Sequence, residues 1–84
     1  MVYRIILKPS AKKELNKLPE KDQYRVLAII PTLANNPYSG KKLAGPAKGL
    51  YSLRVWPYRI IYEANKQTIT IFIIRIGHRQ GVYK

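Results

Sequence analysis

One stretch decides the fold of this 84-residue chain: LYSLRVWPYRIIY, from Leu50 to Tyr62. Both halves mix apolar with polar side chains and are rich in branched and aromatic residues, as β-strands are. We therefore predict strands over 50–56 and 58–64, with Pro57 in the turn between them. In the first strand, side chains two residues apart share a face, so Ser52 and Arg54 lie opposite Leu53 and Val55.

A third strand follows this pair. Asn65-Lys66 favours a tight turn, and 67–76 is the most apolar segment, so we predict the last strand there. Gly77 ends it and begins a short basic tail over 77–84.

The segments that precede the hairpin predict a strand and two helices. Residues 2–7 indicate a strand, and Ser10 is a good N-cap for a helix that Pro19 ends. A second helix begins near Pro19-Glu20 and ends at 35–37, and Pro31 inside it either kinks or splits it. Residues 37–49 are predicted to form a loop.

The resulting order is strand, helix, helix, strand, strand, strand, in a single domain over 1–84. Helices followed by a run of strands are typical of an α+β fold. We expect the two N-terminal helices to pack on one face of a small antiparallel sheet, which leaves the other face available for binding.

The charge balance points to a polyanionic partner. Sixteen Lys and Arg residues face four Asp and Glu, a net charge of +12, and 11% of the residues are aromatic, which favours nucleic acid. A single histidine, no cysteine and four scattered acids do not make a zinc or two-metal site, so we expect no metal and no cofactor. The absence of cysteine, of a signal peptide and of a membrane-spanning stretch fits a cytoplasmic protein without a membrane partner.

Three groups of residues are candidates for a site. Lys41, Lys42 and Lys48 in the loop are either a patch for a phosphate backbone or a solvated surface. Arg59, within an apolar strand, either meets a phosphate or covers the sheet with its stem. The tail holds His78, Arg79 and Tyr83, residue types that can transfer protons and stabilise charge when the 2′-hydroxyl of RNA attacks its own phosphate.

These segments resemble a known family. The runs 50–55 and 58–62, the run RIGHR over 75–79 with Val82-Tyr83, and the opening AKKEL over 11–15 with Leu18-Pro19 resemble the RelE/ParE superfamily of bacterial and archaeal toxins across nearly the whole chain. The resemblance implies a small α+β fold similar to microbial ribonucleases. For RelE-type members it implies metal-independent cleavage of messenger RNA in the ribosomal A site through 2′-hydroxyl attack.

The resemblance also implies residue roles. Arg59 matches an arginine that holds the scissile phosphate, and Arg79 one that stabilises charge and can protonate the leaving group. Tyr83 matches a tyrosine that acts on the 2′-hydroxyl, and His78 stands where members carry lysine or a histidine that serves as general acid. Arg54 matches a strand lysine near the phosphate, whereas Ser52 replaces a lysine.

Three functions remain open at this point. The first is a ribosome-dependent endoribonuclease toxin that is neutralised by an acidic antitoxin and meets operator DNA only through that antitoxin. The second is a ParE-like toxin that poisons DNA gyrase without cleaving RNA. The third is an RNA-binding module without catalytic activity. The presence of arginine, histidine and tyrosine in the matching positions favours the first.

Overall fold

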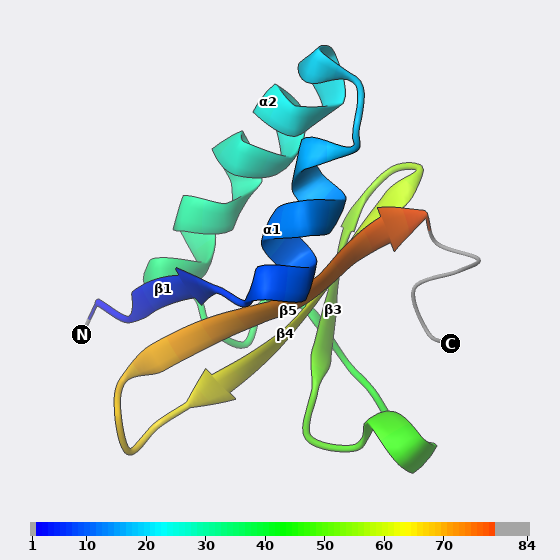
Figure 1. The fold of residues 1–84 in the computed structure, drawn as a ribbon. Helices are drawn as coiled ribbons and strands as arrows, with labels where there is room; N and C mark the ends of the chain where they lie inside the picture. Colours follow the sequence, from blue (N-terminus) through cyan, green and yellow to red (C-terminus); the bar gives the residue numbers. More distant parts are fainter. Residues whose placement is uncertain (1, 79–84) are drawn as a thin grey trace.

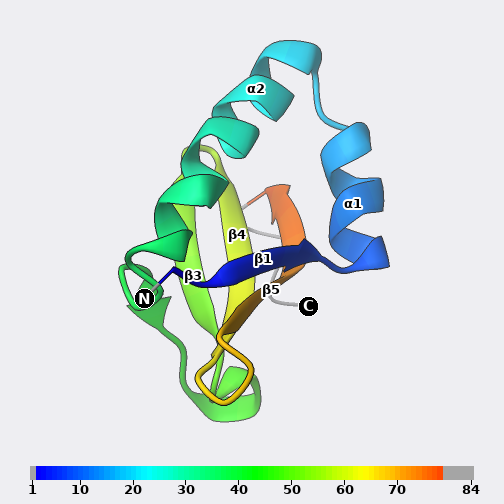
Figure 2. The same ribbon diagram turned by 90° about the vertical axis from the view of Figure 1, so that its left-hand side faces the viewer.

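Two helices lie side by side on one side of a five-stranded sheet in the computed structural model, which describes residues 2–78 (Figures 1 and 2). This agrees with the predicted α+β class and with the predicted order of the main elements. The elements are β1 (Arg4–Leu7), α1 (Pro9–Asn16), α2 (Glu20–Ile29), the 3-10 segment η1 (Ile30–Ala34), β2 (Lys41–Lys42), the 3-10 turn η2 (Gly45–Ala47), β3 (Tyr51–Val55), β4 (Tyr58–Asn65) and β5 (Thr70–His78).

The sheet is mixed, which corrects the prediction of a wholly antiparallel one. Its strand order is β1-β5-β4-β3-β2, and β2 to β5 form antiparallel pairs. The first strand, β1, pairs with the last, β5, in the parallel sense, with Arg4 opposite Thr70 and Leu7 opposite Ile73. Parallel neighbours need a long connection, and here the rest of the chain supplies it.

Two helix boundaries differ from their sequence signals. The first helix begins at Pro9 with Lys8 at the cap position, and the Ser10 hydroxyl donates to the Ile74 carbonyl at 2.9 Å instead of capping the helix. Pro31 splits the second helix rather than kinking it, because α2 ends at Ile29 and a 3-10 segment follows. Proline cannot donate the amide hydrogen that a continuing α-helix requires.

The core lies between the helices and one sheet face. Its buried members come from both layers: Ala11, Leu15, Val26, Ile30, Leu33, Ile60, Tyr62, Ile71, Ile73 and Ile76. A β-bulge shapes this face, since Ile61 is opposite Arg75 while Tyr62 is opposite Ile73, which leaves Ile74 as an extra residue in β5. The bulge allows Ile73 and Ile76, three residues apart, to face the same core.

The segment over 37–49 is not wholly a loop, since it contains β2 and η2. Gly40 holds it close to the sheet: its amide donates to the Tyr62 hydroxyl at 3.0 Å, and a Cβ there would lie 2.8 Å from that hydroxyl oxygen. Any larger residue would push the segment away. This close approach sets Lys41 beside β3, opposite Ser52.

The last strand runs over Thr70–His78 instead of the predicted 67–76, so it begins three residues later and includes Gly77 and His78, which the sequence pattern assigns to the tail. No helix within residues 2–78 has the length and apolar character needed to cross a membrane.

Candidate functional site

The β3–β4 hairpin places two arginines side by side. Arg54 is directly opposite Arg59 in the antiparallel register. Leu53 and Val55 pack against the core, so the alternation of the strand directs Arg54 and Arg59 to the opposite sheet face, which we call the outer face. Gly77 of β5 is the third member of this row and contributes no side chain.

No acidic residue compensates this arginine pair, Arg54 and Arg59. Like charges directly opposite each other destabilise a sheet. Of the four acidic residues, all within the described part of the chain, Glu14 pairs with Arg75 and Asp22 with Arg25, and no carboxylate forms a salt bridge with either member of the pair. Guanidinium groups can hold an anion, and they suit phosphate oxygens in particular because they donate bidentate hydrogen bonds.

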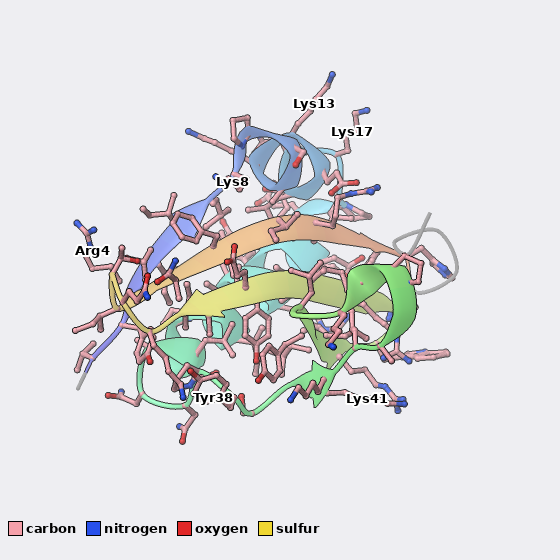
Figure 3. The ribbon with its side chains drawn as sticks, turned by 90° about the horizontal axis from the view of Figure 1, so that it is seen from below. Arg4, Lys8, Lys13, Lys17, Tyr38 and Lys41 are labelled. Carbon is pink, nitrogen blue, oxygen red and sulfur yellow. The ribbon has the colours of Figure 1, made fainter. Side chains whose placement is uncertain are left out.

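The predicted phosphate-binding residues of the loop are distributed around this site. Lys41 is exposed on the outer face in the row beside the arginine pair, while Lys42 is opposite Tyr51, whose ring packs against the core side. Lys48 is exposed just after η2. Figure 3 shows Lys13 and Lys17 projecting from α1, and Lys41 at the far edge of the sheet from that helix. Ser52 shares the outer face but is only 3% exposed.

His78 lies on the other face from Arg59. It is opposite Tyr58 in the register, and the two rings meet edge to face with their centroids 6.5 Å apart. The Tyr58 hydroxyl reaches Asp22 in α2, so this row faces the helices. The structure therefore brings Arg54 and Arg59 together but directs the His78 imidazole to the opposite side of the sheet. Arg79 and Tyr83, predicted to be catalytic, lie outside the described residues.

The tip of the hairpin is fastened to α2. Tyr58 donates to Asp22 Oδ2 at 2.7 Å, and Arg25 donates to Asp22 Oδ1 at 3.3 Å and to the Trp56 carbonyl at 2.7 Å. The Tyr58 and Arg25 hydrogen bonds outweigh burial and lower the pKa of Asp22, and the hydrogen bond to Asp22 raises the pKa of Tyr58. The hairpin that carries the arginine pair is thus held in a fixed place.

Glu14 fastens α1 to the edge of β5 in the same way. Its carboxylate accepts from Arg75 at 2.9 Å and from the Ile76 amide at 2.9 Å. Burial raises the pKa of Glu14, but the Arg75 and Ile76 hydrogen bonds together outweigh it and lower the pKa overall.

Sequence reasoning did not identify these two anchors, although a signal was present. Helical spacing puts Glu14 on the stripe of Ala11 and Leu18, and Asp22 four residues before Val26. An acid on the apolar stripe of a basic chain indicates a buried ion pair.

Comparison with known proteins shows which family this chain belongs to. The family model described as the ParE toxin of type II toxin–antitoxin systems, parDE, matches residues 5–83. The toxin RelG of Mycobacterium tuberculosis is 30% identical over 90 residues, which cover all of this chain and 99% of RelG. The chain belongs to the RelE/ParE toxin superfamily. A second relative of this toxin, the toxin RelE of the same organism, is 31% identical over 84 residues, 98% of this chain and 87% of that protein.

Solved structures of RelE toxins share the fold. The RelBE2 toxin–antitoxin complex of M. tuberculosis matches with a TM-score of 0.87 and 28% identity, over 94% of this toxin and all of that chain. The archaeal RelE–RelB complex of Pyrococcus horikoshii matches with a TM-score of 0.81 and 29% identity, over 98% of this toxin and all of that chain. This chain is therefore a toxin of the type II toxin–antitoxin class with a RelE-like fold.

Proposed function

We propose that this toxin is a metal-independent, ribosome-dependent endoribonuclease that cleaves messenger RNA in the ribosomal A site and so inhibits translation. The uncompensated arginine pair on the outer face is the observation that carries the proposal. When the 2′-hydroxyl attacks the adjacent phosphate, negative charge gathers on a crowded phosphorane, and fixed guanidinium groups lower the energy of that state. The two curated relatives, whose names are RelG and RelE, support the same reading.

The proposal divides the chemistry among the predicted residues. Arg59 and Arg54 hold the phosphate; guanidinium hardly deprotonates, so neither is suited to move a proton. The attacking hydroxyl must lose a proton and the leaving 5′-oxygen must gain one. We assign these steps to Tyr83 and His78, with Arg79 stabilising the charge that develops, and the position of His78 on Tyr58's face gives it the weaker claim of the two.

The net positive charge of this toxin and the complexes formed by its relatives indicate its partners. An acidic antitoxin would neutralise the +12 surface, and the two solved relatives are complexes of RelE toxins with RelB antitoxins. We propose that this toxin has such a cognate antitoxin in the cytoplasm and contacts operator DNA only through it. Lys41, Lys42, Lys48 and the α1 lysines would contact ribosomal RNA.

A second candidate is a toxin that poisons DNA gyrase. The observation that favours it is the family model, which is described by the ParE toxin. On this alternative the arginine pair has no scissile phosphate to hold, and its substitution leaves toxicity unchanged.

Primer extension on translated message tests the proposal. Wild-type toxin is expected to produce cuts in phase with codons, Arg79→Ala to abolish them and Arg59→Ala to reduce them strongly. Lys66→Ala is the matched control, because Lys66 follows the far end of β4 and also removes one positive charge. Cleavage of naked oligonucleotides is expected to be much slower, since the ribosome orders the substrate.

Two outcomes would change the assignment. Intact message together with inhibited DNA supercoiling by gyrase would replace the ribonuclease with the gyrase toxin. Cuts that persist unchanged in His78→Ala would remove His78 from proton transfer and leave the class of reaction intact.

A further inference from the structure

We propose that the indole of Trp56 is a stacking platform for a nucleobase of the bound RNA, next to the phosphate held by the arginine pair. In the structure Trp56 is 55% exposed, so more than half of its surface is accessible to solvent. A large aromatic ring at the surface leaves apolar area in contact with water, which stacking against a base removes.

The position of Trp56 gives the first argument. It occupies the turn between β3 and β4, two residues after Arg54 and three before Arg59. At a rise of about 3.3 Å per strand residue, two residues correspond to roughly 7 Å. A nucleotide bound through its phosphate at the arginine pair therefore has a base within reach of the turn. Of the large apolar residues exposed within 2–78, Trp56 is the one in this hairpin.

The fixed backbone of the turn gives the second argument. The Trp56 carbonyl accepts from Arg25 at 2.7 Å, and Asp22 accepts from both Arg25 and Tyr58. Three side chains thus tie the turn to α2. A platform that is already ordered loses less conformational entropy when a base stacks on it, so more of the stacking energy becomes affinity.

The electrostatic surroundings give the third argument. The nearest charged side chains along the hairpin are Arg54 and Arg59, and neither forms a salt bridge with an acid in the part of the chain that the structure describes. A surface aromatic beside unpaired cations matches the two components of single-strand binding, which are a positive track for phosphates and π-faces for bases. Stacking does not depend on hydrogen bonds to base edges, so this contact tolerates every base.

The inference rests on the proposed function in one respect, that the ligand is RNA. The test uses the intact protein and a short fluorescein-labelled RNA with 2′-O-methyl groups throughout, which cannot be cut because the attacking hydroxyl is blocked. A second oligonucleotide has the same backbone but no bases. Trp56 is the sole tryptophan, so a change in tryptophan emission on binding reports this residue alone.

Wild-type toxin is expected to lose tryptophan emission on saturation with the base-containing strand but not with the abasic strand. By fluorescein anisotropy it should bind the base-containing strand about tenfold more tightly. Trp56→Ala should bind the two strands equally, and Trp56→Phe should retain part of the preference. The slope of affinity against salt should stay unchanged in Trp56→Ala and fall in Arg59→Ala, because only the second removes a phosphate contact.

Tyr24→Ala is the matched control, since Tyr24 is 65% exposed and lies on α2, outside the hairpin; it should behave as wild type. Unquenched emission in wild type at saturation, or an equal preference for bases in Trp56→Ala, overturns the inference. The wild-type comparison of the two strands decides the matter even where a variant folds poorly.

The ribosome assay separates this inference from the proposed function. Codon-phased cutting without quenching overturns stacking and leaves the ribonuclease. Quenching with base preference but no cutting supports stacking and overturns the ribonuclease.

Discussion

Arg75 and Arg59 stand on adjacent strands of one sheet in opposite electrical surroundings. The Arg75 guanidinium is held by the Glu14 carboxylate, which also accepts from the Ile76 amide. Arg59 has another arginine, Arg54, as its direct cross-strand neighbour and forms no salt bridge within residues 2–78. The first arrangement contributes stability, while the second costs stability, a cost that the proposed phosphate ligand would offset.

The contrast teaches how a strongly basic chain distributes four acids. Glu14 fastens α1 to β5, and Asp22 fastens α2 to the hairpin tip. Glu20 and Glu63 form no salt bridge within the described chain. Two of the four carboxylates thus lie where helices meet the sheet, and neither offsets the positive charge of the arginine pair on the outer face. Substitutions in the two regions should therefore have effects of opposite kind.

The largest effect is expected for Arg59→Ala. Removing a cation that stabilises charge in the transition state should lower the rate of message cleavage by about 100-fold or more. Stability should not fall, because Arg59 has no salt bridge to break among the described residues. Rates from quantitative primer extension and thermal unfolding followed by circular dichroism check both halves. Arg75→Ala is the counterpart: its main effect should be a lower melting temperature, because it breaks the ion pair with Glu14. If Arg59→Ala were destabilised but cleaved message normally, Arg59 would be a stabilising residue like Arg75 and not a functional one.

Next in size is the loss of the Glu14 anchor. Glu14→Gln removes the charge that binds Arg75 and weakens the bond from the Ile76 amide, which should cost about 2 kcal/mol. For a domain of this size that corresponds to a fall in melting temperature of about 10 °C. Urea or thermal unfolding measures it. Glu20→Gln is the control, because Glu20 is exposed and should change stability little; equal losses in both variants would show that Glu14 is not an anchor.

The Glu14 contribution should depend on pH. Its pKa in the folded protein is lowered from the ordinary value of 4.5, so as the pH falls the unfolded chain takes up the proton first. The stabilisation is complete above pH 4.5 and is lost as the pH falls through the folded pKa. The stability gap between wild type and Glu14→Gln should narrow over this range in unfolding titrations. A gap that is constant down to low pH would mean that the carboxylate charge contributes nothing.

The smallest effect is a gain. Arg54→Gln removes the like-charge neighbour of Arg59 and should stabilise the fold by about 0.5 kcal/mol at low salt. The gain should disappear at high salt, because these side chains reach solvent and are screened. Lys12→Gln, on the surface of α1, removes the same charge from a place without a cross-strand cation and should show a smaller gain. Destabilisation by Arg54→Gln would reveal a stabilising partner for Arg54.

Much of the fold follows from local patterns in the sequence. The alternation in 50–62 and the turn at Pro57 predicted the β3–β4 hairpin, and the family resemblance implied that Arg54 and Arg59 both lie near a phosphate; that the two are direct cross-strand neighbours came from the structure. The helical stripes predicted both helices, but whether Pro31 kinks or splits the second one required the structure. The prediction that Ser10 caps the first helix was wrong, because its hydroxyl donates instead to the carbonyl of Ile74 in β5, which lies 64 residues further along the chain.

The face of His78 could not be read from the sequence, and the reason is a single residue. Strict alternation from Ile71 would direct 73, 75 and 77 toward the core and 78 away from it. The extra residue at Ile74 reverses this order, so that Ile76 and His78 face the helices while Gly77 joins the row of Arg59. One bulge therefore separates the histidine from the arginine pair.

The sequence by itself determined the class of fold, the order of the main elements, the hairpin and the excess of positive charge, because periodicity, turns and composition act over neighbouring residues. The tertiary structure alone decided that β1 joins β5 in parallel, that Glu14 and Asp22 anchor the helices, and that Trp56 stands exposed beside the arginine pair. These features depend on register and packing between residues far apart in the chain, where one added residue changes which side chains meet.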